Sequence, residues 1–456
     1  MSTATPEPRV GGPPPTCAVE DAVERIRLRN PTLCAFVTTR LDQALERDAE
    51  LARAAPRSPL HRVPYALKDL WDTAGIPTTG GSDRFIDRVP ETSSPVFEVF
   101  EAAGAVLMGK TNLSDMSLPP EATSYVGGAT KNPHDLERTA GGSSGGAACA
   151  VADGMVAFDW GSDFGGSIRM PAAFCGVLGM RLSSSTWPVI GSFPDGPEEV
   201  RWMNGQGPIA RTTSQMRAVL EVAAPRLRTG PALPFSLRGA ALWPPDRGRW
   251  PSFRLDVERH LARAAGELTD AALPTPTRTR NIALAMYAAH FEEMVAMDSM
   301  PLSEGVRAAV SALVLRGAFG DKRLHPTTAW LMILMALGRA TIFRDKQKAR
   351  DAAARFGDDV AERWDRGFLV ATPVCCYPAP IIGRTDKNPN LISCTVGGNL
   401  SDATSIAIPF GRFENGMPRA LQLMGPPGSE HSLLDVAERL IASRDTDPLL
   451  TPVGPR

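Results

Sequence analysis

The chain has 456 residues, of which 43% are apolar, and its 49 basic and 50 acidic side chains leave a net charge of −1. That length is enough for one large domain or two fused units, and the near-zero charge excludes a polycationic nucleic-acid binder as the default. No apolar run approaches the ~20 residues of a membrane span, and the seven cysteines form no CxxC pair, which favours a reduced, cytoplasmic protein without a disulfide framework.

The first part of the chain predicts an arm followed by helices and a strand. Residues 1–16 are rich in Pro and Gly and predict a flexible N-terminal arm. Apolar residues recur at three- and four-residue spacing over 19–29 and 40–54, which predicts two helices. A short apolar run at 62–67 predicts a strand that ends at Lys68.

The next signals are a capped helix and a change of composition. Ser94 and Pro95 combine cap and first-turn chemistry, so a helix is expected to begin there and to end at Gly104. A strand is expected directly afterwards, over 105–108. The segment from about 225 to 365 is rich in Arg, Ala and Leu and is expected to be mostly helical.

The last third of the chain returns to short strands. Within the helical segment, the ten-residue apolar run 329–338 predicts a buried helix. Strands are expected at 368–372 and 404–408, and a final helix at 432–443. Because helices alternate with buried apolar strands, the sequence predicts an α/β architecture.

One motif resembles a nucleotide site. Residues 104–111 match the GxxxxGK[ST] pattern of a phosphate-binding loop. Such a loop follows a strand, whereas here a helix precedes the first glycine, and the intervening Ala-Val-Leu-Met favours burial. We therefore interpret this segment as a buried strand.

A second motif resembles the nucleophile elbow of a hydrolase. The sequence GGSSGG at 141–146 fits GxSxG twice, but that elbow requires an acid and then a histidine downstream. None of the histidines that follow it has a distinctive neighbourhood: His260, His290, His325 and His431. The pattern does not support a Ser-His-acid triad.

A third set of residues combines serines with a lysine. Lys68 ends an apolar run, Ser143 and Ser144 lie in the first glycine cluster, and Ser167 lies in the segment GSDFGGSIR at 161–169. A serine nucleophile needs a base, and Lys is one only when burial lowers its pKa enough to make it neutral. Only seven of the 49 basic residues are lysines, so a Lys at an apolar strand end is informative. The alternative is a structural Lys that caps backbone carbonyls.

The glycines before Ser167 suggest a second component of catalysis. Because glycine accepts unusual dihedrals, the stretch Phe164, Gly165, Gly166 and Ser167 can aim successive backbone N–H groups at one point. Such donors form an oxyanion hole, and each can stabilise a transition state by ~3 kcal/mol. For the bare motif, a tight turn in the core is the alternative.

The combination resembles the amidase signature family. Three sequence segments carry the resemblance: GGSSGGAACAVADG from Gly141, GSDFGGSIRMPAAFCGVLGMR from Gly161, and VPYALKDLWDTAGIPTTGGS at 63–82. The resemblance covers about 60–215 and 365–445. It implies an α/β fold with a mixed twisted central sheet covered by helices on both faces.

The resemblance also implies how the chain is organised and which residues act. It implies one large domain over 17–456, with a variable helical insert at about 225–365 that lines the substrate pocket. Ser167 would be the nucleophile, and Ser143, after a cis peptide bond, would bridge it to Lys68 as the ultimate base. The oxyanion would be held by the backbone of Phe164, Gly165, Gly166 and Ser167. The residues expected to orient the catalytic loops are Ser144, Asp163 and Arg169.

The implied function is hydrolysis of the C–N bond of a non-peptide carboxylic amide through a serine acyl-enzyme. No metal or organic cofactor is implied. We expect a small-molecule amide as substrate and no nucleic-acid or membrane partner. The assembly state stays open, and a homodimer is one of the alternatives. The alternatives are an A-type subunit of a glutamyl-tRNA amidotransferase, a biosynthetic acyltransferase or amide synthase that uses the same acyl-enzyme, and a non-catalytic binding protein on this fold.

Three departures from the family pattern lie beside the site and bear on substrate fit. Ala147 replaces a common Ser, Asp159-Trp160 stands where a small apolar pair is usual, and 181–183 reads Arg-Leu-Ser instead of Lys-Pro-Thr. Several large side chains are candidates for the pocket wall, with core packing as the alternative. These are Trp187, Phe193, Trp202, Met286, Tyr287, Phe291 and Met294.

Overall fold

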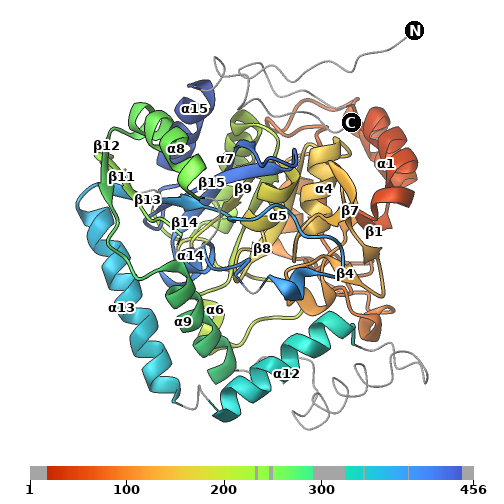
Figure 1. Cartoon of the computed structure of the whole chain (residues 1–456). Helices are drawn as coiled ribbons and strands as arrows, with labels where there is room; N and C mark the ends of the chain where they lie inside the picture. The colour runs from red at the N-terminus through yellow and green to blue at the C-terminus, as the bar shows by residue number, and fades with distance from the viewer. Residues whose placement is uncertain are drawn as a thin grey trace.

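The computed structural model describes residues 18–231, 235–245, 250–290, 324–341, 345–388 and 390–443, and Figure 1 shows the arrangement of its elements. The arm expected at 1–16 lies outside the described residues.

A mixed sheet of eleven strands runs through the described part of the chain, which confirms the predicted sheet type. Its order is β1-β3-β2-β8-β10-β9-β14-β15-β13-β11-β12. The strand β2 pairs in parallel with β3 and β8, β11 pairs in parallel with β12 and β13, and the other neighbours are antiparallel. The strand bounds are β1 Phe36–Thr39, β2 Pro64–Lys68, β3 Val106–Thr111, β8 Phe158–Asp163, β9 Leu178–Arg181, β10 Gly205–Ala210, β11 Gly239–Leu242, β12 Glu267–Asp270, β13 Phe368–Pro373, β14 Thr404–Arg412 and β15 Pro418–Gly425.

Two further pairs of short strands lie outside this sheet. They are β4 Thr123–Ser124 with β5 Gly128–Ala129, and β6 Lys131–Asn132 with β7 Asp135–Thr139.

Helices cover both faces of the sheet, as predicted (Figure 1). The helices α3, α7, α8 and α15 pack on one face. The other face is covered by α1, α2, α4 and α5, and over β13 by α13. The helix α9 packs against α13, and α12 and α14 pack against α9. The helix bounds are α1 Val19–Leu33, α2 Leu41–Leu51, α3 Pro95–Ala102, α4 Gly145–Asp153, α5 Arg169–Cys175, α6 Glu198–Arg201, α7 Thr213–Leu227, α8 Trp250–Ala265, α9 Pro276–Ala289, α12 Pro326–Thr341, α13 Lys346–Asp365, α14 Val396–Leu400 and α15 Glu430–Ala442, with short 3₁₀ turns η1 Asp83–Phe85, η2 Asp115–Ser117 and η3 Thr385–Lys387.

Local sequence explains the elements that carry the site. Pro95 occupies the first turn of α3, where its missing N–H costs nothing, and the apolar face of that helix is buried. The helix α4 consists almost entirely of small residues, and all nine are buried. Its contacts with β2, β3 and β8 place the residues just before it beside the end of β2.

The described residues of the segment 225–365 are mostly helical, as expected, but they also contribute β11 and β12 to the central sheet. Gly239–Leu242 reads Gly-Ala-Ala-Leu, which has no β-branched or aromatic residue to signal a strand. Parallel pairing with β13 on one side and β12 on the other supplies what local propensity lacks.

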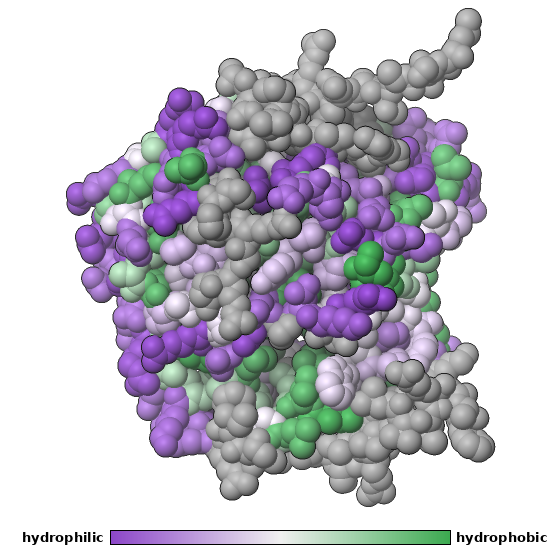
Figure 2. All heavy atoms as spheres, in the orientation of Figure 1, coloured by the Kyte–Doolittle hydropathy of each residue, from purple (hydrophilic) through white to green (hydrophobic). Residues whose placement is uncertain are grey.

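The run 329–338 does form a helix, within α12, but the expectation that it is buried is wrong. Trp330, Leu334 and Leu337 are 46%, 46% and 57% exposed. Their spacing of four and three residues puts them on one face of the helix, so only the opposite face packs on the core. Apolar side chains gather on the surface over α12 (Figure 2). Among the described helices, none is both long and apolar enough to cross a bilayer.

Candidate active site

Lys68 lies at the end of β2, with β3 on one side and β8 on the other. Its side chain is fully buried. The Nζ atom donates to Ser143 Oγ at 2.6 Å and to Ser162 Oγ at 2.9 Å. The partners are therefore two hydroxyls, not the backbone carbonyls that a purely structural capping lysine would hold.

Burial changes the acid–base chemistry of this lysine. Loss of hydration lowers the pKa of Lys68 to about 7, against the opposing charges of Asp163 and Asp159. A group with this pKa is substantially neutral at physiological pH, and a neutral amine can accept a proton.

Ser143 approaches Lys68 from the loop that precedes α4. The peptide bond between Gly142 and Ser143 is cis, as the family resemblance implied. A Cβ on Gly142 would lie 2.5 Å from the backbone nitrogen of Glu121, so this position has room only for glycine.

Ser144 links the two glycine-rich loops. Its backbone N–H donates to the Ser167 carbonyl at 3.1 Å, and its Oγ donates to the Ser162 carbonyl at 3.3 Å. The residue is fully buried. These contacts agree with an orienting role and not with the exposed serine of a hydrolase elbow.

The loop after β8 carries Ser167, which is half-buried. The Asp163 carboxylate accepts hydrogen bonds from the backbone N–H groups of Gly166 at 2.8 Å and Ile168 at 3.0 Å. The Gly166 N–H is therefore engaged and differs from the neighbouring donors expected to hold an oxyanion. Among the described residues, no hydrogen bond is made by the backbone N–H groups of Phe164, Gly165 and Ser167.

Close packing against Thr395 leaves no room for a side chain at Gly166. Its φ is +122°, and a Cβ there would lie 2.3 Å from Thr395 Oγ1. That hydroxyl donates to the Gly165 carbonyl at 2.7 Å and fixes the loop from the side of α14. On the other side, the Tyr287 hydroxyl of α9 donates to the Phe164 carbonyl.

A buried ion pair anchors the same loop. Arg169 Nη2 donates to Asp163 Oδ1 at 2.7 Å, and the two side chains are fully buried. Although burial alone would raise it, the charge and hydrogen bonds of Arg169 hold the pKa of Asp163 below its ordinary value. Arg169 also donates to Asn399 Oδ1 and Gln422 Oε1, each at 2.7 Å, which ties the loop to α14 and β15.

The structure thus brings Lys68, Ser143 and Ser144 together with the loop that contains Ser167. Sequence reasoning missed Ser162, whose only signal was its place inside the motif GSD. It also missed the roles of Thr395 and Tyr287, which lie far along the chain and have no motif of their own.

Residues 106–111 of the motif that resembles a phosphate-binding loop form the strand β3, which is fully buried. Lys110 Nζ donates to the Trp71 carbonyl and to Thr78 Oγ1, each at 2.7 Å, and lies 3.5 Å from Asp69. The prediction of a buried strand is confirmed.

The candidate pocket residues have mixed environments. Trp187 and Met286 are buried in the core, and Tyr287 is nearly so. The Phe193 ring is covered by the Arg88 guanidinium at 3.8 Å. Trp202 lines a groove of about 430 Å³ together with Met286. The remaining two candidates, Phe291 and Met294, lie outside the described residues.

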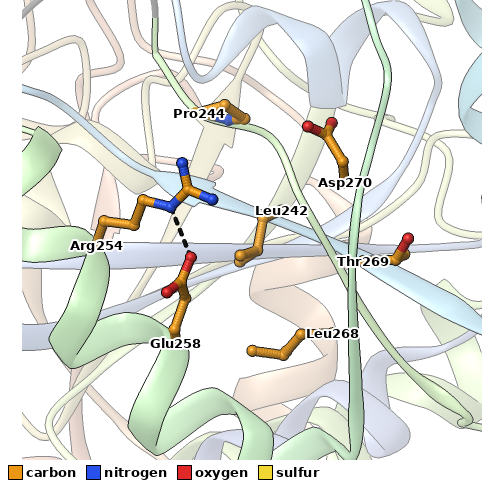
Figure 3. Close-up of a pocket in the computed structure, with 7 residues that line it drawn as sticks. All are labelled: Leu242, Pro244, Arg254, Glu258, Leu268, Thr269 and Asp270. Carbon is orange, nitrogen blue, oxygen red and sulfur yellow. Dashed lines mark hydrogen bonds and ion pairs between the residues drawn. The ribbon is translucent and has the colours of Figure 1, made fainter.

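A further pocket of about 360 Å³ lies at the other end of the sheet, between α8 and the ends of β11 and β12 (Figure 3). An Arg254–Glu258 ion pair borders it. Five strands, namely β10, β9, β14, β15 and β13, separate β11 from β8, so this pocket is not part of the Lys68 site.

Comparisons with known proteins agree with this geometry. The sequence profile described as Amidase matches residues 18–233 and 252–434. The A-type subunit of glutamyl-tRNA(Gln) amidotransferase from Symbiobacterium thermophilum is 30% identical over 96% of this chain and 96% of its own length, and the protein of the same name from Anaeromyxobacter sp. (strain K) is 31% identical over 96% and 94%.

Solved structures share the fold. A 6-aminohexanoate cyclic dimer hydrolase has a TM-score of 0.73 at 23% identity and covers 93% of each chain. The native peptide amidase from Stenotrophomonas maltophilia has a TM-score of 0.74 at 22% identity and covers 97% of this chain and 95% of its own. With the profile match over nearly the whole length, the chain belongs to the amidase family and is an amide-cleaving enzyme.

Proposed function

We propose that this enzyme hydrolyses the C–N bond of a non-peptide carboxylic amide through an acyl-enzyme on Ser167, with Ser143 and Lys68 completing a Ser-cisSer-Lys triad. The observation that carries the proposal is the 2.6 Å hydrogen bond between Lys68 Nζ and Ser143 Oγ. A fully buried lysine with a lowered pKa, held on a hydroxyl, is suited to receive a proton through that hydroxyl.

In the acylation step, Ser167 Oγ attacks the carbonyl carbon while its proton passes to Ser143 Oγ. The proton of Ser143 moves at the same time to neutral Lys68 Nζ. The new C–O bond places a negative charge on the carbonyl oxygen, which backbone N–H groups of Phe164, Gly165 and Ser167 stabilise. Because the Gly166 N–H already donates to Asp163, we assign it to the support of the loop.

Collapse of this intermediate breaks the C–N bond. The proton on Lys68 returns through Ser143 to the leaving nitrogen, which departs as a neutral amine. Water then attacks the acyl-enzyme and gives up a proton along the same route. Release of the carboxylic acid restores the Ser167 hydroxyl and neutral Lys68.

The substrate is a small-molecule amide in this proposal, and residues of the segment 225–365 contribute to its pocket. Tyr287 supports this assignment because α9 brings it to the Phe164 carbonyl, beside the proposed oxyanion donors. A screen of aliphatic and aryl amides would identify the acyl group that fits.

A second candidate function is that of an amidotransferase subunit. The observation in its favour is the name of the curated relatives, which match this chain almost end to end. The Arg181-Leu182-Ser183 departure and the balanced net charge weigh mildly against it. Co-purification of a second subunit from the native source would support this role, and hydrolysis by the isolated chain at full rate would argue against it.

The acyl-enzyme chemistry is shared with amide synthesis until the last step. Product analysis with an added amine therefore distinguishes hydrolysis from acyl transfer: the carboxylic acid is the expected product, and a new amide in excess would indicate a synthase.

The proposal is tested by trapping the intermediate. An activated acyl substrate should leave one acyl group on Ser167, detectable by peptide mass spectrometry. Ser167→Ala should remove both adduct and turnover while the fold persists, because the substitution removes little volume. Ser144→Ala is the matched control and should still be acylated at Ser167. An adduct on Ser144 in the wild type would contradict the assignment.

A further inference from the structure

A buried carboxyl, that of Asp159, lies on the strand next to Lys68, the proposed base. Asp159 in β8 is fully buried. In the parallel pairing of β2 with β8 it stands opposite Ala66, two residues before Lys68. Residues that pair across strands share a face of the sheet, and so do residues two apart along a strand. Asp159 and Lys68 therefore lie on the same face, on neighbouring strands.

The contacts of Asp159 are incomplete for an ionised carboxylate. The Thr111 hydroxyl of β3 donates to Oδ2 at 2.8 Å. The other oxygen, Oδ1, is buried and accepts no well-aligned hydrogen bond from any described residue, although the backbone N–H of Lys68 lies close enough to favour the ionised carboxyl. A buried charge with an unsatisfied oxygen is costly unless a cation lies close by.

The charged groups around Asp159 leave Lys68 as its counter-charge. On β3, Lys110 lies against Asp69 at 3.5 Å. On β8 itself, Asp163 is paired with Arg169. The neighbouring strand β10 places Ile209 opposite Asp159 and carries no charged side chain.

The helix packed over this face adds no other cation. The titratable residues of α4 are Cys149 and Asp153, and Asp153 is held by Arg25 and Arg29 of α1. In the described part of the chain, Lys68 is thus the cation that remains for Asp159.

We propose that Asp159 is a positioning residue that controls when Lys68 becomes neutral: the two buried side chains titrate as a coupled pair. The inference rests on the proposed function, in which Lys68 is the base. When Asp159 is ionised it holds a proton on Lys68 and delays the appearance of the neutral amine. When Asp159 is protonated and neutral, it no longer stabilises the protonated form of Lys68, and Lys68 loses its proton at lower pH.

The acid–base properties of the two groups support the coupling. Burial raises the pKa of Asp159 to about 7, against the Thr111 hydrogen bond and the charge of Lys68. Burial lowers the pKa of Lys68 into the same range, against the charge of Asp163, which is the stronger of the two, and that of Asp159. Two interacting groups with such similar values lose their protons in two steps that belong to the pair.

Asp159→Asn tests the inference, because it keeps the shape and removes the charge. The measurement is the pH dependence of both amide turnover and the rate at which a fluorophosphonate labels Ser167. Without the negative charge, Lys68 loses its proton more easily. The pH at which activity rises, called here the rising limb of the pH–rate profile, should therefore move to lower pH by about one unit. Asp153→Asn is the matched control: it also removes a buried carboxylate, but one held by arginines of α1, and it should leave the limb in place.

Thr111→Val provides a second variant that keeps the carboxyl. Loss of the hydroxyl that favours the ionised form raises the pKa of Asp159, so the limb should again move to lower pH, by less than in Asp159→Asn. Thermal melting checks that each variant is folded. If Asp159→Asn does not fold, the result for Thr111→Val alone tests the inference. A folded variant whose limb coincides with that of the wild type overturns the inference.

Failure of the proposed function has a different signature. If the wild-type limb persists in Lys68→Arg, Lys68 is not the base and the proposed function fails with the inference. If the limb depends on Lys68 but does not respond to Asp159→Asn or Thr111→Val, only the inference fails.

Discussion

Lys68 Nζ lies 2.6 Å from Ser143 Oγ, although 75 residues separate the two along the chain. The strand β2 carries the lysine to its buried end, and the loop before α4 carries the serine to the same point. A second hydroxyl, Ser162 Oγ, lies 2.9 Å from the same nitrogen. The amine is thus held between one hydroxyl proposed to move a proton and one that orients it.

The two hydroxyl partners of Lys68 should differ in their contribution to catalysis. Ser143→Ala removes the proposed proton bridge, so amide turnover should fall by about 10²–10⁴-fold. Ser162→Ala removes only an orienting hydrogen bond, worth about 1–2 kcal/mol, and should cost roughly tenfold. The values of kcat for the two variants on one amide substrate measure the difference. Equal losses would show that Ser143 only orients the lysine.

The buried Lys110–Asp69 pair should contribute to stability and not to nucleotide binding. Lys110→Met leaves the Asp69 carboxylate buried without its counter-charge, so the free energy of unfolding should fall by about 3–5 kcal/mol. The double variant Lys110→Met/Asp69→Asn should recover part of that loss, because no uncompensated charge remains. Denaturant titration of the wild type, Lys110→Met, Asp69→Asn and the double variant measures the coupling.

The same contacts argue against nucleotide binding at residues 104–111. Lys110 is fully buried and hydrogen-bonded to Trp71 and Thr78. Millimolar Mg-ATP should therefore leave the melting temperature unchanged, since only a ligand that binds the native state raises it. A clear shift that is lost in Lys110→Met would overturn the interpretation of 104–111.

The sequence predicted the half of the fold that carries the proposed triad better than the remainder. The strand expected at 62–67 appears as Pro64–Lys68, and the helix expected from Pro95 begins there. Apolar runs and cap residues carry that information locally. By contrast, Gly239–Leu242 becomes a strand of the main sheet only because β12 and β13 pair with it, and no local pattern records such pairing.

The site shows the same division between local and distant information. The glycine-rich motifs predicted the two loops, and the apolar run that ends at Lys68 predicted the lysine, because each signal lies within a short continuous segment. Thr395 could not be found in this way, because its hydroxyl reaches the Gly165 carbonyl from 230 residues away. The exposed face of α12 also escaped prediction, since a run that is apolar all round does not say which side will pack.

The Asp163–Arg169 pair should be required for the oxyanion loop. Asp163→Asn weakens the acceptor for the Gly166 and Ile168 N–H groups and leaves Arg169 with an unbalanced buried charge. We expect a loss of about 3–5 kcal/mol in the free energy of unfolding. Fluorophosphonate labelling of Ser167 should slow markedly in protein that remains folded. A stable variant with wild-type labelling would contradict the anchoring role.

Tyr287 should support catalysis through the position of the Phe164 carbonyl. Tyr287→Phe removes one hydrogen bond, worth about 0.5–1.5 kcal/mol, so kcat should fall about threefold to tenfold with little change in KM. Tyr125→Phe is the matched control, because Tyr125 is 45% exposed. A change in KM alone would instead assign Tyr287 to substrate binding.

The central claim is that Lys68 acts as a neutral base, and pH-dependent assays of a matched amide and ester on the wild type, Lys68→Arg and Lys68→Ala test it most directly. The wild type should gain activity as the pH rises through about 7, because burial lowers the pKa of Lys68 to that value and only the deprotonated amine accepts a proton. Lys68→Arg should fail on the amide as badly as Lys68→Ala, by about 10²–10⁴-fold, since arginine stays protonated. The ester should suffer less, because an alkoxide needs less help than an amine to leave. Near-wild-type amide turnover by Lys68→Arg would contradict the account.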